Sequence, residues 1–209
     1  MIYYSVFDFS SLTDGQTDFL RRNICKYFSD EKTLKRKESV AVKALLCRML
    51  AECFGLTDFT VSCDLHGKPY IENSNLHFNL SHSGNYALCV CADEAVGCDI
   101  EKIKECNLKV AQRFFSKSEF AVLKNSDNTA HVFTKMWTLK ESALKFSGKG
   151  ISGGLDCYDF SEYYKEDKFR MMNLHFFSFE KDGYSVSICS EGDALTRYNT
   201  DIGEIITDS

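Results

Sequence analysis

Apolar residues in the first hundred positions follow first a strand pattern, then a helical one, then strand patterns again. Ile2–Phe9 predicts a strand, and apolar residues at helical spacing from Phe19 to Phe28 predict a helix. A longer helix is predicted from about Asp30 to Phe54, with Gly55 as its stop. Four strands are then expected, at Phe59–Cys63, Leu76–Leu80, Tyr86–Ala92 and Ala95–Ile100. Because Tyr86–Ala92 is apolar on both faces, it should lie inside a sheet.

The second hundred residues repeat this order of helices and strands. Ser116 and Glu119 have the spacing of a capping box, which predicts a helix through Leu123. A long helix is expected over about Thr129–Phe146, ending near Gly148. The predicted strands that follow are Asp156–Phe160, Phe169–Met172, Leu174–Glu180 and Tyr184–Ser190. We therefore predict an α+β fold of two halves, residues 1–104 and 105–209, packed together because no Pro- or Gly-rich linker separates them.

Charge and cysteine usage narrow the class of protein. The net charge of −5 argues against nucleic-acid binding, and no apolar stretch reaches the ~20 residues that a membrane helix needs. Ten cysteines could indicate disulfides, but Met1–Phe9 has no features of a secretory signal, and no cysteine pair has CxxC spacing. We expect reduced, buried thiols in a cytoplasmic protein.

Three carboxylates are candidates for a cation site. Asp99 and Glu101 lie two apart at the end of an apolar strand, so their side chains share a face. Glu141 lies four residues before Lys145 on the long helix, so these two also share a face. Oxygen ligands of this kind suit Mg²⁺. The alternatives are polar residues at a strand end and an ordinary exposed Glu–Lys pair.

Several further polar residues could bind an anionic ligand. Ser81 and His82 form a polar turn after an apolar strand, and Lys68 precedes the only proline. On one continuous helix, Lys32, Arg36 and Lys43 would lie within about 40° of each other, flanked by Lys35. Such a stripe can hold phosphate, although a solvated face remains the alternative.

The order of these motifs is more specific than any one of them. Gly-Lys-Pro (67–69) is followed by Phe-Asn-Leu-Ser-His-Ser (78–83), Val-Gly-Cys-Asp-Ile-Glu (96–101), Arg-Phe-Phe-Ser-Lys-Ser-Glu (113–119) and Trp-x-x-Lys-Glu-Ser-x-x-Lys (137–145). Over about Lys32–Phe160 the chain resembles the Sfp-type 4′-phosphopantetheinyl transferases. The resemblance implies two α+β halves related by a pseudo-two-fold axis, with coenzyme A bound between them.

The resemblance also implies roles for individual residues. Asp99, Glu101 and Glu141 would form the Mg²⁺ site, with Glu101 acting directly or through a water, and Lys145 would contact the pyrophosphate. The positions that match coenzyme A contacts are Lys68, Ser81, His82, Lys32, Lys35 and Lys43. Lys43 replaces an arginine that is frequent in the family and would lack its bidentate fork.

The activity implied is transfer of 4′-phosphopantetheine from coenzyme A to a serine of an apo acyl or peptidyl carrier protein, releasing 3′,5′-ADP. The serine proton would go to Glu141 or to a water near the metal. We expect a monomer that contacts the carrier through Arg113–Leu123, unless the phenylalanines of this segment are core residues. Two alternatives are a non-catalytic coenzyme-A-binding protein and a Mg²⁺-dependent nucleotide hydrolase.

Overall fold

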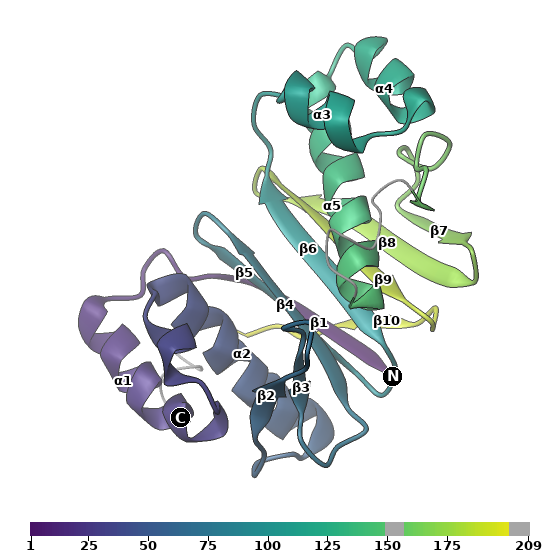
Figure 1. Cartoon of the computed structure of the whole chain (residues 1–209). Helices are drawn as coiled ribbons and strands as arrows, with labels where there is room; N and C mark the ends of the chain where they lie inside the picture. Colours follow the sequence, from purple (N-terminus) through teal and green to yellow (C-terminus); the bar gives the residue numbers. More distant parts are fainter. Residues whose placement is uncertain (149–156, 201–209) are drawn as a thin grey trace.

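The structure, a computed structural model, describes residues 1–148 and 157–200. Within these ranges, the chain forms two four-stranded sheets and a small hairpin, with one long helix packed on each large sheet (Figure 1). The strands are β1 (Ile2–Asp8), β2 (Val61–Cys63), β3 (Pro69–Ile71), β4 (His77–Ser83), β5 (Tyr86–Ala92), β6 (Val96–Lys102), β7 (Lys168–Met171), β8 (Leu174–Lys181), β9 (Tyr184–Ser190) and β10 (Leu195–Arg197). The helices are α1 (Asp14–Ile24), α2 (Lys37–Phe54), α3 (Leu108–Phe114), α4 (Lys117–Lys124) and α5 (Thr129–Ser147), with 3-10 turns at Cys25–Tyr27 and Glu31–Leu34.

The first sheet has the strand order β10-β1-β5-β4. β5 pairs antiparallel with both β1 and β4, which confirms that the apolar segment Tyr86–Ala92 is an interior strand. α2 covers one face of this sheet and contributes fully buried Leu45 and Met49 to a core that includes Phe78 and Cys89. This helix ends at Gly55 in the left-handed conformation, as predicted.

The second sheet has the order β6-β9-β8-β7, and its neighbouring strands are antiparallel. α5 lies across β6 and β9, and its buried Leu139 and Ala143 pack against Phe176 and Phe160. α3 and α4 pack at the N-terminal part of α5 (Figure 1). The sheet thereby has its helices on one face.

The two sheets share a third apolar core, which packs the halves of the molecule directly together. Leu88 and Val90 of β5 belong to the same buried cluster as Ile100 of β6 and Ile188 of β9. β6 lies before the predicted boundary at residue 104 but pairs with β9, and β10 lies after it but pairs with β1. The chain thus crosses between the sheets twice. The division into halves 1–104 and 105–209, and the pseudo-two-fold axis, stay predictions.

The α+β class is confirmed, but the predicted helix from about Asp30 to Phe54 is wrong in its first part. Glu31–Leu34 form a separate 3-10 turn, and Arg36 is extended, with φ −101° and ψ 145°. The break has a local cause, because the Asp30 side chain caps the short turn and Leu34 turns into the core. The predicted basic stripe on one helical face therefore does not form, since α2 begins at Lys37.

Most of the remaining boundaries follow the predictions. The predicted polar turn at Ser81 and His82 is wrong, because β4 continues through both residues to Ser83. β2 begins at Val61 and not at Phe59. The capping box of Ser116 and Glu119 opens α4, and Gly148 ends α5 in the left-handed conformation. The predicted strand at Asp156–Phe160 is wrong for residues 157–160, and Asp156 lies outside the described residues. β3, β10 and α3 are additional to the prediction. Of the described helices, none combines the length and apolar character needed to cross a bilayer.

Candidate active site

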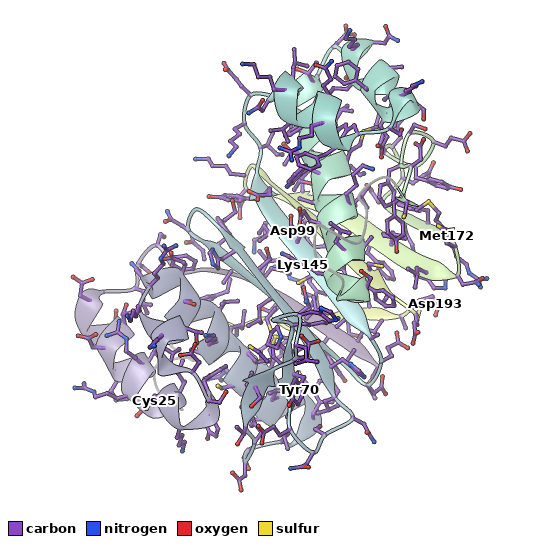
Figure 2. The ribbon with its side chains drawn as sticks, in the orientation of Figure 1. Cys25, Tyr70, Asp99, Lys145, Met172 and Asp193 are labelled. Carbon is purple, nitrogen blue, oxygen red and sulfur yellow. The ribbon has the colours of Figure 1, made fainter. Side chains whose placement is uncertain are left out.

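A cleft of about 400 Å³ lies where β4, β6 and α5 meet. Asp99 of β6 and Lys145 of α5 face each other there (Figure 2). The side chains that line the cleft are Leu80, Ser81, His82, Asp99, Glu101, Trp137, Glu141 and Lys145. All three predicted metal ligands therefore line one cavity, together with Lys145, which was expected to contact the pyrophosphate.

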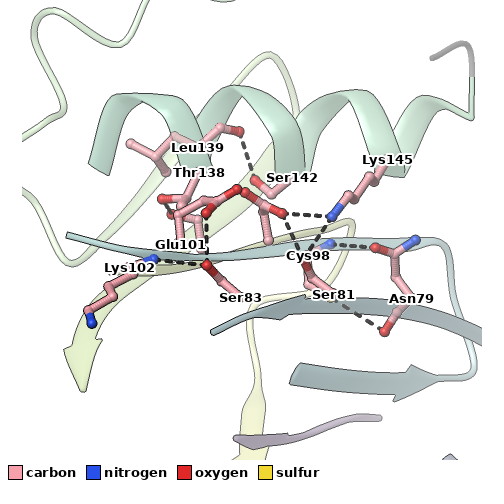
Figure 3. A network of polar contacts seen from close by, with 12 residues as sticks. Asn79, Ser81, Ser83, Cys98, Glu101, Lys102, Thr138, Leu139, Ser142 and Lys145 are labelled. Carbon is pink, nitrogen blue, oxygen red and sulfur yellow. Dashed lines mark hydrogen bonds and ion pairs between the residues drawn. The ribbon is translucent and has the colours of Figure 1, made fainter. Parts of the chain in front are cut away.

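Asp99 is the most buried acid of this cleft. Its Oδ1 accepts hydrogen bonds from Lys145 Nζ at 2.7 Å and from Ser81 Oγ at 2.8 Å (Figure 3). Lys145 also donates to Ser81 Oγ at 3.0 Å, so the three side chains form a closed triangle. Asp99 Oδ2 is buried and has no hydrogen-bond partner among the described residues. A buried carboxylate oxygen in that state is open to a cation.

Glu101 and Glu141 reach the same cleft from different elements. Glu101 lies on β6 two residues after Asp99. Its Oε2 accepts a hydrogen bond from Ser83 Oγ at 2.9 Å. Burial raises the pKa of both Glu101 and Glu141, and the negative charge of Asp99 raises it further. Carboxylates that disfavour one another's charge in this way gain most from a shared cation.

Lys145 pairs across the cleft and not along its own helix. Burial works against its charged form, but the charge and hydrogen bond of Asp99 outweigh this and raise the pKa of the ammonium. Among the described residues, the ion pair of Lys145 is with Asp99, and none joins it to Glu141. The simple exposed Glu–Lys pair considered from the sequence is therefore wrong.

The residues present fit a hard divalent cation. The acidic set offers only oxygen donors, one of them the unpartnered Asp99 Oδ2, and oxygen is what Mg²⁺ prefers. Within residues 1–148 and 157–200, however, no group of three or more His, Cys, Asp or Glu side chains is already close enough to hold a metal. A shared ion would require Glu101 or Glu141 to move toward Asp99.

A second cavity of about 270 Å³ adjoins the first, and both are lined by Leu80, Glu141 and Lys145. Lys68 lines it from the loop between β2 and β3, and its Nζ donates to the carbonyl oxygen of Phe146 at 2.9 Å. Burial lowers the pKa of Lys68. The two cavities together extend from the β2–β3 hairpin to the acidic residues.

The remaining predicted ligand contacts are less closely grouped. His82 lines the cleft. Burial lowers the pKa of its imidazole; the negative charge of Glu38 opposes this shift, and the positive charges of Lys145 and Arg36 add to it. Lys32 lies on the 3-10 turn and Lys35 directly follows it, and both side chains are exposed. Neither lysine lines one of the two cavities. Lys43 donates to the carbonyl oxygen of Thr33 at 3.2 Å and lies over the Phe28 ring.

The sequence motifs contain several further residues of this site to which the sequence assigned no role. Trp137 lines the cleft one turn before Glu141, and Ser83 contacts Glu101. Asn79 lines the adjoining cavity and accepts from the Cys98 amide at 3.0 Å. The signal was available, because Asn79, Ser81 and Ser83 alternate along one strand and so share a face.

Two other hypotheses concern residues outside the cleft. Phe115 is a core residue stacked on Phe133, and Phe114 lies edge-on to Trp137, so the core alternative holds for Phe115 in the segment Arg113–Leu123. No disulfide joins any two of the described cysteines, and the thiols of Cys89 and Cys91 lie 3.6 Å apart at hydrogen-bonding distance. A separate cavity of about 360 Å³ between α1 and α2 contains none of the predicted site residues.

Comparison with known proteins places this chain in a family. The model of the 4′-phosphopantetheinyl transferase superfamily matches residues 95–191, which include β6 and α5. A 4′-phosphopantetheinyl transferase of Bacillus subtilis is 33% identical over 179 residues, 80% of this chain and 78% of the relative. 4′-Phosphopantetheinyl transferase Sfp of Bacillus subtilis (strain 168) is 35% identical over 143 residues, 66% of this chain and 63% of the relative. The L-aminoadipate-semialdehyde dehydrogenase-phosphopantetheinyl transferase of Saccharomyces cerevisiae is 30% identical over 135 residues, 55% of this chain and 50% of the relative. The chain therefore belongs to the Sfp-type 4′-phosphopantetheinyl transferases.

Proposed function

We propose that this chain transfers 4′-phosphopantetheine from coenzyme A to a serine of an apo acyl or peptidyl carrier protein. The observation that supports this most directly is the single cleft in which β6 supplies Asp99 and Glu101 and α5 supplies Glu141 and Lys145. Transfer of a phosphorylated group needs positive charge beside the reacting phosphate and a group that accepts a proton. Both are available in this cleft.

Asp99, Glu101 and Glu141 would hold the Mg²⁺ ion. When bound, Mg²⁺ supplies positive charge that offsets the negative charge developing on the transferred phosphoryl group. The unpartnered Oδ2 of Asp99 supports this assignment. So does the raised pKa of the two glutamates, which reflects crowded negative charge.

Coenzyme A would occupy the two adjoining cavities. Lys68 and His82 lie at opposite parts of this joint cleft, with Lys145 between the cavities that they line. Lys145, charged because Asp99 stabilises its ammonium, can turn toward the pyrophosphate. Ser81 would bind phosphate through the hydroxyl that now contacts Asp99 and Lys145. Lys32, Lys35 and Lys43 would add positive charge from the 3-10 turn and α2.

The reaction exchanges the phosphoanhydride bond of coenzyme A for a phosphate ester bond to the carrier serine. The carrier serine oxygen bonds to the β-phosphorus of coenzyme A, and the bond from that phosphorus to the oxygen shared with the α-phosphate breaks. The serine proton passes to Glu141, directly or through a water. Lys145 stabilises the departing 3′,5′-ADP, which keeps the electron pair of the broken bond.

A mass-shift experiment tests this function. A panel of apo carrier proteins is incubated with coenzyme A, Mg²⁺ and the chain, and each carrier is weighed by intact-protein mass spectrometry. We expect one carrier to gain a phosphopantetheine unit, and the Glu141→Gln variant to lose this activity by more than about 100-fold. Cleavage of coenzyme A without any modified carrier would support a nucleotide hydrolase instead. Binding of coenzyme A with no cleavage at all would support a non-catalytic protein.

No disulfide joins the described cysteines, which supports a reducing compartment, so we also propose that the reaction takes place in the cytoplasm. We propose further that the enzyme acts as a monomer.

A further inference from the structure

A row of three polar side chains on β4 holds the edge of β6. Asn79, Ser81 and Ser83 alternate along β4 and therefore point to one side. Asn79 Oδ1 accepts a hydrogen bond from the backbone amide of Cys98 at 3.0 Å, and Ser83 Oγ accepts one from the amide of Lys102 at 3.2 Å (Figure 3). Because β6 is an edge strand of the second sheet, side chains of the first sheet here bind amides that no neighbouring strand covers.

The two serines of this row each contact one of the two acidic residues of β6. Ser81 Oγ donates to Asp99 at 2.8 Å, and Ser83 Oγ donates to Glu101 at 2.9 Å. The sequence separation is the same in both pairs, since each acid follows its serine by 18 positions. One sheet therefore sets how the acidic side chains of the other are oriented.

The acidic partners of Ser81 and Ser83 differ in the number of other side chains that bind them. Asp99 is bound by Lys145 in addition to Ser81. Glu101 has no ion pair with any described residue, and its described side-chain hydrogen bond comes from Ser83. The Ser83 hydroxyl accepts from the Lys102 amide, which leaves its hydrogen directed at Glu101 Oε2. Glu101 Oε1 makes no hydrogen bond with the described residues and stays available to a ligand of the cleft.

We propose that Ser83 is a positioning residue, which fixes one oxygen of Glu101 so that the other is presented to the divalent cation. This inference rests on the proposed metal site. Hydrogen bonds to a ligating carboxylate remove alternative rotamers before the metal binds, and loss of such a contact typically weakens metal binding by 10- to 100-fold, roughly. Ser83 touches neither the substrate nor the ion and acts through Glu101 alone.

The test measures the binding of Mn²⁺ to the full chain without coenzyme A. Electron paramagnetic resonance reports the concentration of free Mn²⁺ at each step of the titration. We expect Ser83→Ala to raise the Mn²⁺ dissociation constant about tenfold. Ser83→Thr keeps the hydroxyl on a strand, where β-branched residues fit, and should stay within about threefold of wild type. Circular dichroism checks that each variant is folded, which we expect because the hydrogen bond between the Lys102 amide and Ser83 is exposed to water.

Ser62→Ala is the matched control. Ser62 Oγ donates to Glu72 on the β2–β3 hairpin, so this variant loses a hydrogen bond of the same type outside the acidic cleft. Its Mn²⁺ affinity and transfer activity should equal those of wild type. Equal Mn²⁺ affinity of Ser83→Ala and wild type would overturn the role of Ser83 alone. Failure of the wild-type chain to bind Mn²⁺ would overturn the proposed metal site itself.

Discussion

Lys145 Nζ lies 2.7 Å from Oδ1 of Asp99, across the boundary between α5 and β6. Asp99 is almost fully buried, while the Lys145 side chain keeps 29% of its exposure. The second oxygen of Asp99 has no partner in the described chain. The ammonium group thus supplies the positive charge that this buried carboxylate needs, at the place where we propose that a cation binds.

Lys145→Met should destabilise the fold in a manner that Mg²⁺ partly reverses. Removing one partner of a fully buried pair costs ~3–5 kcal/mol, and we expect about 2 kcal/mol because Lys145 is partly exposed. A thermal melt should show a Tm lower by about 4–8 °C. Mg²⁺ should raise the Tm of the variant more than that of wild type, because Asp99 has lost its competing cation.

The double variant Asp99→Asn/Lys145→Met serves as the control for this experiment. With no carboxylate to neutralise, it should recover much of the lost stability and respond little to Mg²⁺. An equal Mg²⁺ response in Lys145→Met and wild type would contradict the counter-charge role of Lys145.

Gly97→Ala should separate α5 from β6. A Cβ at position 97 would lie 2.1 Å from the carbonyl oxygen of Ser142 and 2.3 Å from the Phe146 amide nitrogen, so the helix must shift. We expect a cost of about 1–3 kcal/mol in urea unfolding, with a large loss of transfer activity because Glu141 and Lys145 move with the helix. Gly15→Ala is the control, since a Cβ at position 15 would meet no heavy atom of another part of the chain within 4 Å and alanine favours the helix. Unchanged activity in Gly97→Ala would show that the site tolerates a displaced α5.

Lys140→Met should cost far more stability than an average surface change. Lys140 Nζ lies 2.9 Å from Glu119 Oε2, and both side chains are completely buried. Glu119 also accepts hydrogen bonds from the backbone amides of Ser116 and Phe160. Together with the ion pair to Lys140, these bonds connect α4 and the segment before β7 to α5. Loss of the lysine leaves a buried, uncompensated carboxylate, for which ~3–5 kcal/mol is expected in chemical denaturation.

A double-mutant cycle with Glu119→Gln isolates this pair. The combined variant Glu119→Gln/Lys140→Met should be more stable than Lys140→Met alone, because the buried charge is gone. Additive losses would show that the two side chains act independently.

Asp159 should make a small contribution to stability that depends on pH. Burial opposes its ionisation, but hydrogen bonds from Ser118, Ser161 and Ser116 outweigh this and lower its pKa to about 2. Since the folded pKa lies below the unfolded value of about 3.9, the contribution is complete above pH ~5 and is lost as the pH falls toward 2. The Tm difference between wild type and Asp159→Asn should therefore shrink between pH 6 and pH 3, roughly. A difference that stays constant over this range would rule out the depressed pKa.

The parts of the fold that could be predicted are those with a short-range signal. β5 follows from an unbroken apolar run, and the ends of α2 and α5 follow from Gly55 and Gly148. The start of α2 was missed because the side-chain cap of Asp30 favours a separate turn over helix continuation. β10 was missed because a three-residue strand that pairs with β1 across the whole chain length carries no periodicity.

In the candidate site, too, the residues could be predicted from local sequence motifs, whereas the contacts between distant segments could not. Its acidic residues and Lys145 were found from motif order, and they do line one cleft. The contacts among them were not found, since the pairing of Lys145 with Asp99 and of Ser83 with Glu101 depends on how two sheets meet. Spacing along one helix had instead suggested Glu141 as the partner of Lys145.

We propose that β6 and α5 present three carboxylates to one cation beside coenzyme A. Crystals grown with coenzyme A and Mn²⁺ test it through the anomalous scattering of manganese. We predict one strong peak in the cleft, within ~2.3 Å of oxygens of Asp99 and Glu141 and bound by Glu101 directly or through a water. A peak elsewhere on the protein, or coenzyme A in the cleft with no manganese near Asp99, would show that these carboxylates do not form the metal site.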